Sequence, residues 1–106
     1  MGIKADSREL ERHLAVIIEH LLRLKFVTGQ ALHDNARGWT LSVVTQRNEL
    51  KDHLEEHPAL KPKITSQLMD RVYESVVTDL TKAYPQVHFP MTRQLRVTDI
   101  LGTEIA

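Results

Sequence analysis

The chain has 106 residues, of which 14 are basic and 14 acidic, so its formal net charge is zero. This length predicts a single domain, residues 1–106, built around one hydrophobic core. The balanced charge and the lack of a basic block do not indicate nucleic acid or an anionic membrane as a partner. Because the sequence contains no cysteine, disulfides, thiolate nucleophiles and cysteine-based metal sites are excluded.

Neither the N-terminal segment nor any later stretch has the pattern of a targeting or membrane-spanning element. The first ten residues lack the apolar core and cleavage site of a signal peptide. No apolar run approaches the roughly 20 residues that span a bilayer. We therefore expect a soluble cytoplasmic protein without a membrane partner. Since the glycines are isolated and form no Walker loop or dinucleotide fingerprint, we also expect no cofactor.

Three stretches carry apolar residues at the three-and-four spacing of a helix, and we predict helices over residues 7–27, 38–56 and 62–83. In the first stretch, Asp6 or Ser7 is suited to the N-cap position. A helix that is apolar on more than one side lies at the centre of a bundle or in a subunit interface. The first stretch has such a wide stripe, made of Leu10, Leu14, Ile17, Leu21 and Leu24 with further apolar neighbours.

Glycine and proline mark the predicted ends of these helices. Gly29 suits the left-handed C-terminal cap of the first helix, and residues 30–37 are predicted to form a connection. Pro58 disfavours the helical conformation at His57, so the second helix is predicted to end just before that histidine. Pro62 fits the first turn of the third helix.

The second helix carries the only tryptophan of the chain. Its apolar stripe consists of Trp39, Val43, Leu50 and Leu54, with Arg47 in the middle. We expect this helix to be the one on which the other two pack.

The last part of the chain, residues 84–106, has no long periodic pattern and is predicted to be an irregular arm. Alternation at Leu95 and Val97 permits a short strand, and residues 98–101 permit one helical turn before Gly102. Long helices with short connections predict an all-α fold. The predicted architecture is an antiparallel helical bundle of three long helices with an irregular C-terminal arm.

Several short segments occur in an order and spacing typical of a known family. They are His20-Leu21-Leu22-Arg23-Leu24-Lys25, the stretch GWTLSVVTQR at residues 38–47, Pro58-Ala59-Leu60-Lys61-Pro62, Tyr73, and Phe89-Pro90 followed by Asp99-Ile100-Leu101. Over residues 7–102 the sequence resembles the uncharacterised bacterial family catalogued as domain of unknown function number twenty-nine. The resemblance implies an all-helical fold without an established activity. Family members carry a further N-terminal helical segment that this sequence does not show, so we expect an apolar face left for a partner and a homo-oligomer.

The resemblance also suggests one set of candidate ligand-binding residues, His20, Trp39, Arg47 and Tyr73. If they converge, Arg47 could bind a carboxylate or phosphate while His20 supplied acid–base chemistry. The preferred interpretation is a structural network, in which Glu19 or the carboxyl end of a helix binds Arg47 and the backbone binds Tyr73.

His53-Leu54-Glu55-Glu56-His57 has the H-x-x-E-H order of inverted zinc proteases. A zinc site would need both imidazoles, a third ligand and a glutamate that activates water. Because His57 precedes Pro58, its ring is not held on the helix beside His53. The preferred interpretation is therefore a solvated helix end, with a metal at His53 and His57 as the alternative.

The function that fits these observations is a non-catalytic helical interaction and assembly module that self-associates. The wide apolar stripe of the first helix and the Met69 and Val77 side of the third would form the assembly surface. An oligomeric nucleic-acid-associated regulator is one alternative, carried by the basic residues Arg8, Arg12, Arg23 and Lys25. A small metal-dependent hydrolase that uses the His53/His57 pair or a His20/Arg47 site is the other.

Overall fold

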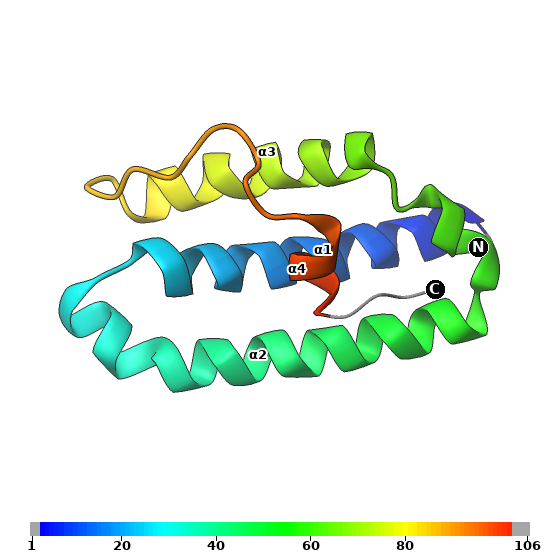
Figure 1. The fold of residues 1–106 in the computed structure, drawn as a ribbon, viewed down its shortest axis with the longest axis horizontal. Coiled ribbons are helices and arrows are strands. Elements are labelled where there is room, and N and C mark those ends of the chain that lie inside the picture. Colours follow the sequence, from blue (N-terminus) through cyan, green and yellow to red (C-terminus); the bar gives the residue numbers. More distant parts are fainter. Residues whose placement is uncertain (1–2, 103–106) are drawn as a thin grey trace.

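Three long helices lie side by side, with the first helix in the middle (Figure 1). The computed structural model describes residues 3–102, and the side chains from residue 6 onward. The elements are α1 (Ile3–Phe26), α2 (Gly29–Glu56), the 3₁₀ helix η1 (Pro58–Lys63), α3 (Ser66–Ala83) and α4 (Val97–Leu101). Consecutive long helices run in opposite directions, and no strand occurs within residues 3–102. The predicted all-α fold with three long helices is confirmed.

The central helix is α1, and the prediction that α2 takes this place is wrong. Leu14, Ile17 and Ile18 are 0% exposed, because α2 packs on one side of α1 and α3 on the other. By contrast, α2 buries only one face and leaves Leu41 58% exposed on the other. The wide stripe of α1 is therefore covered within the chain.

The side of α3 that was expected to contribute to an assembly surface is also covered. Met69 and Val77 are both 0% exposed. The large apolar side chains that remain exposed among the described residues are Leu41 and Val44 on α2 and Met91 in the arm. The surface that the sequence suggested for self-association is therefore buried within the chain.

The start of α2 is the largest error in the predicted boundaries. This helix begins at Gly29 rather than at residue 38, so the predicted connection 30–37 is helical. Gly29 has a φ of 74°, which allows the chain to reverse after only two non-helical residues. Local bonds support the extra turns: the side chain of Gln30 donates to Asp34 at 2.7 Å, and that of Asn35 to the oxygen of Ala31 at 2.7 Å.

The remaining boundaries differ in smaller ways. α1 begins at Ile3, so Asp6 and Ser7 lie inside the helix rather than at its cap. Pro62 belongs to η1 instead of α3, since Thr65 caps α3 by accepting a hydrogen bond from the Leu68 amide at 3.1 Å.

The ends of α2 and of the arm agree better with the sequence. α2 ends at Glu56 and His57 is its C-cap, as Pro58 predicts. The permitted strand at Leu95 and Val97 does not form, because Val97 starts α4 and no neighbouring strand exists within residues 3–102. The helical turn predicted before Gly102 is confirmed.

Candidate functional site

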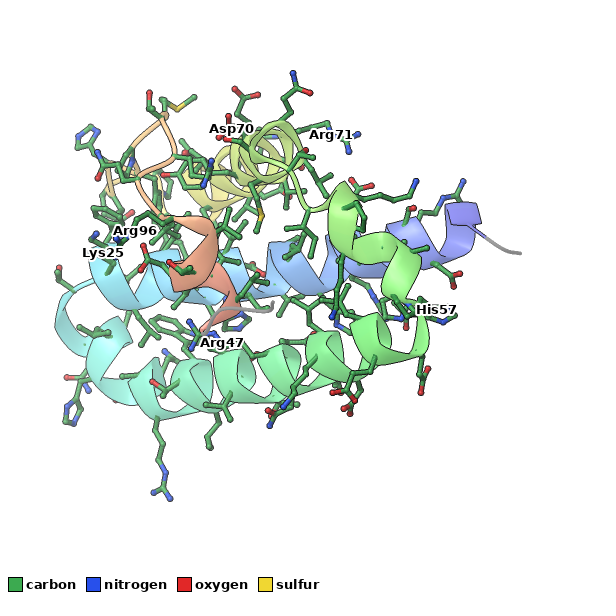
Figure 2. All side chains as sticks on the ribbon, turned by 45° about the vertical axis from the view of Figure 1, so that its right-hand side comes forward. Lys25, Arg47, His57, Asp70, Arg71 and Arg96 are labelled. Atoms are coloured by element: carbon green, nitrogen blue, oxygen red, sulfur yellow. The ribbon has the colours of Figure 1, made fainter. Side chains whose placement is uncertain are left out.

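Arg47 reaches from α2 to the carboxyl end of α4. Its Nη2 donates to the main-chain oxygen of Asp99 at 2.6 Å, and its Nε donates to that of Ile100 at 3.1 Å. Figure 2 shows Arg47 in this position, between α2 and α4. The last carbonyls of a helix have no partner within the helix and carry its negative dipole end, so a guanidinium is a favourable partner there. Both groups that Arg47 binds are therefore main-chain groups.

Gly102 completes this end of α4. It has a φ of 81° and forms the left-handed C-cap, and its amide donates to the oxygen of Thr98 at 2.8 Å. A β-carbon at this position would lie 2.7 Å from both Cδ and Nε of Arg47. Position 102 thus requires glycine for two reasons: the backbone is left-handed, and the guanidinium of Arg47 approaches closely.

The start of α4 is held by a different contact. The amide of Arg96 donates to the carboxylate of Asp99 at 2.8 Å. This hydrogen bond lowers the pKa of Asp99 below its usual 3.8, and the side chain of Arg96 adds to the effect. The positive end of the helix dipole also stabilises a carboxylate in the first turn.

The apolar face of α4 packs into the core. Ile100 is 0% and Leu101 is 8% exposed, and both belong to the main hydrophobic cluster. α4 has five residues and contacts α1. Helices this short are not stable alone, so α4 depends on the surface that receives it. We call this surface the α4 docking site: the part of α1 that contacts α4, together with Arg47 of α2.

The other predicted ligand-binding residues have partners of their own. His20 Nδ1 faces the oxygen of Val16 at 2.8 Å. The hydroxyl of Tyr73 donates to the oxygen of Pro90 at 2.7 Å, and burial raises its pKa, so it stays protonated. Within residues 3–102, no hydrogen bond or ring contact joins any two of His20, Trp39, Arg47 and Tyr73. The polar members each face a main-chain oxygen, which favours a structural network.

Trp39 has a structural partner of its own. The guanidinium of Arg23 lies 5.7 Å from the Trp39 ring centroid and 5.8 Å from that of Tyr84. Arg23 also pairs with Glu19 at 2.8 Å. Its buried Nε has no hydrogen-bond partner in the described part of the chain, and the two ring faces supply the electrostatic contact instead. Arg23 therefore links α1 to α2 and to the end of α3.

Three histidines pair with carboxylates across the contact between α1 and α2, near the amino end of α1. His53 Nδ1 lies 3.3 Å from Glu9, His57 Nδ1 lies 3.5 Å from Asp6, and His13 Nδ1 lies 3.9 Å from Glu49. From Asp6 to His13 the residue numbers increase along α1, while those of their partners decrease along α2 from His57 to Glu49. Antiparallel packing requires this order. We call these six residues the histidine–carboxylate ladder.

The ladder is closely packed. His13 is 5% and His53 is 6% exposed, and their ring centroids are 5.8 Å apart. His53 Nε2 faces the main-chain oxygen of Asp6 at 3.1 Å, and His13 Nδ1 contacts the side-chain oxygen of Gln46 at 2.8 Å. A hollow of about 370 Å³ opens beside these rings. The contacts explain why two imidazoles tolerate burial.

The two imidazoles predicted as metal ligands lie together, although His57 is outside the helix. Their ring centroids are 4.9 Å apart. Within the described residues, however, no three His, Asp or Glu side chains have the arrangement that holds a metal ion. The ladder is thus a set of pairs rather than a convergent ligand shell.

Two features of these sites were missed from the sequence. On α1 the ladder residues are spaced by three and four, and on α2 by four and four, so each set lies on one face of its helix. That spacing was the available signal. The partner of Arg47 had no local signal, because Asp99 and Ile100 are more than 50 residues away.

Comparison with known proteins gives one match. A family model described as Domain of unknown function DUF29 matches residues 1–105. No curated protein and no solved structure matches the chain. Among the described helices, none is long and apolar enough to cross a membrane.

Proposed function

This chain belongs to the DUF29 family, and from its sites we propose that it is a non-catalytic helical interaction module that self-associates. The observation that carries the proposal is the α4 docking site, where Arg47 holds two main-chain oxygens and the core accepts Ile100 and Leu101. Apolar anchors that enter a hydrophobic groove are a general way to bind a helix, and a cation at its last carbonyls adds a favourable contact.

The energetics favour a reversible contact. Burying Ile100 and Leu101 contributes about 3–6 kcal/mol. Two hydrogen bonds from a charged group contribute about 3–6 kcal/mol more. Ordering five residues costs about 5–10 kcal/mol in backbone entropy. Since these contributions nearly cancel, α4 can leave and return without unfolding the helices that receive it.

The polar side chains support binding rather than catalysis. His20, Arg47 and Tyr73 each face a main-chain oxygen, and within residues 3–102 no hydrogen bond joins any two of them. The ladder pairs histidines with carboxylates but gathers no three-donor metal group in the described part of the chain. A hydrolase that uses His53/His57 or His20/Arg47 therefore has less support.

The nucleic-acid alternative also has less support. Arg12 pairs with Glu9, Arg23 pairs with Glu19, and Arg71 pairs with Glu11. Basic and acidic groups are thus interspersed on the surface of α1. Sequence-independent nucleic-acid binding needs a segregated basic face.

Sedimentation equilibrium of the full chain, from about 10 μM to about 1 mM, tests the proposal, with metal analysis of the same sample. We expect the average mass to rise with concentration and no stoichiometric metal. A mass that stays at the monomer value throughout would reject self-association. A monomer with one bound zinc per chain would favour the hydrolase alternative instead.

A further inference from the structure

We propose that the α4 docking site also accepts α4 from a second copy of the chain, so that copies associate by exchanging this short helix. The inference rests on the proposed function, since it names the mode of the self-association. Exchange of an identical element requires no new recognition chemistry, because the contacts that hold α4 within one chain are the same between chains.

The occupant is argued from the bound α4 itself. The contacts that hold it are the two hydrogen bonds from Arg47, the burial of Ile100 and Leu101, and the close fit at Gly102. They join α4 to α1 and α2, and none depends on which chain supplies α4. Any copy presents the same main-chain oxygens and the same apolar pair.

The segment before α4 has a defined point at which the chain could redirect. Arg93 fixes the arm to α3, since its Nε donates to Asp70 at 2.6 Å and its Nη2 to Ser66 at 2.9 Å. Farther back, the bond from Tyr73 to Pro90 holds the arm as well. Arg93 Nη1 also donates to the main-chain oxygen of Leu95 at 2.7 Å, and Leu95 packs against the core, so the fixed arm extends to residue 95. Arg96 alone then joins the arm to α4, and it lies outside any helix.

Concentration decides which form is populated. A site on the same chain experiences its own α4 at an effective concentration of about 1 mM, as is usual for short connections. The unmodified chain should therefore exchange α4 mainly as its total concentration approaches this range. Any change that releases α4 from its own site, but leaves a second site intact, lowers the concentration that is needed.

Two full-length variants with complementary defects test the exchange. Gly102→Val spoils α4, because valine disfavours the left-handed conformation and would meet Arg47, but it leaves the docking site intact. Arg47→Met spoils the site and leaves α4 intact. Neither variant alone combines an intact α4 with an intact docking site. In a mixture, the α4 of Arg47→Met can enter the docking site of Gly102→Val.

The measurement is the sedimentation mass of each variant and of their equimolar mixture, with helicity checked by circular dichroism. We expect monomers for each variant alone. The mixture should form a heterodimer at a concentration at least tenfold below that at which the unmodified chain associates, because no intact intramolecular contact competes.

Two further outcomes separate this inference from the proposed function. If the unmodified chain and both variants associate equally, self-association stands and α4 exchange is rejected. If the unmodified chain associates but the mixture stays monomeric, exchange is again rejected. Should either variant lose helicity, a synthetic peptide of residues 93–102 replaces the donor chain. It must then bind a full-length Ile100→Asp chain at least tenfold more tightly than the unmodified chain, and a failure to do so rejects exchange.

Discussion

Arg47 and Gly102 are 55 residues apart in sequence, yet a β-carbon on the glycine would lie 2.7 Å from the arginine Cδ. This approach places the guanidinium on the last carbonyls of α4, where a cation is most favourable. Arg47 and Gly102 thereby hold the carboxyl end of a five-residue helix whose apolar face is buried in the core.

Replacement of that glycine should release α4. For Gly102→Ala we expect the docking of α4 to lose about 1–2 kcal/mol from the left-handed backbone alone. The contact of the new β-carbon with Arg47 adds to this loss. Hydrogen exchange at the Ile100 amide, which donates to the Arg96 oxygen, reports the loss. Gly38→Ala is the matched control, since that glycine is inside α2 with open space around it. Gly38→Ala should raise the free energy of unfolding by about 0.5–1 kcal/mol, because alanine is more stable than glycine inside a helix. Equal protection in both variants would argue against the fit at Gly102.

Acid should loosen the start of α4. The pKa of Asp99 is lowered in the folded chain, mainly by the hydrogen bond from the Arg96 amide. The stability that this carboxylate adds is therefore present above its usual pKa of 3.8, and it is lost as pH falls through the lower folded value. Amide chemical shifts of residues 97–102, followed from pH 6 to pH 2, should move together in this range. In Asp99→Asn the transition should disappear, and its persistence would assign it to another group.

The Tyr73 hydroxyl should matter for the arm. In Tyr73→Phe the oxygen of Pro90 loses its donor, and we expect a loss of about 1–3 kcal/mol in the free energy of unfolding. Tyr84→Phe is the control, because no hydrogen bond of that hydroxyl occurs among the described residues. Urea denaturation measures both variants. Equal values for the two would show that the bond to Pro90 does not contribute.

Alkaline pH offers a second test of the same tyrosine. Burial raises the pKa of Tyr73 above 10.0, so the folded chain retains this proton longer than the unfolded chain. Stability that depends on the neutral phenol is complete below about pH 10 and declines as pH rises above it. Between pH 9 and pH 11, the unmodified chain should therefore lose more stability than Tyr73→Phe does. A larger loss in the variant would contradict the burial of the hydroxyl.

The ladder should show energetic coupling across α1 and α2. A double-mutant cycle of Glu9→Gln and His53→Gln should give a coupling energy of about 0.5–1 kcal/mol, since Glu9 is partly exposed. Glu9→Gln combined with His33→Gln, at the exposed start of α2, is the control and should be additive within about 0.5 kcal/mol. Equal coupling in the two cycles would mean that the ladder pairs do not interact.

The sequence predicts the helices better than their order in space. Periodic apolar positions locate the long helices, and Pro58 gives the end of α2 correctly. The start of α2 was missed because Gly29 and Gly38 are both plausible helix boundaries. The longer helix is favoured by the packing of Leu32 against the core and by the local bonds of Gln30 and Asn35. Trp39 suggested a central α2, but the width of the stripe on α1 was the better guide.

The sites could be predicted only in part. The carboxyl end of a helix was among the partners expected for Arg47, and a backbone partner was expected for Tyr73. Which helix Arg47 binds depends on where the arm folds back, and no local pattern contains that information. The ladder needs the register of α1 against α2, which the sequence of neither helix specifies alone.

The most direct test of the α4 docking site is the sedimentation mass of the unmodified chain compared with Arg47→Met, both measured up to about 1 mM. Arg37→Met is the control, since Arg37 is exposed on α2. We expect the mass of the unmodified chain and of Arg37→Met to rise from monomer toward dimer, while Arg47→Met stays monomeric. A monomeric unmodified chain over the whole range, or equal association of Arg47→Met, would contradict a self-associating module that works through this site.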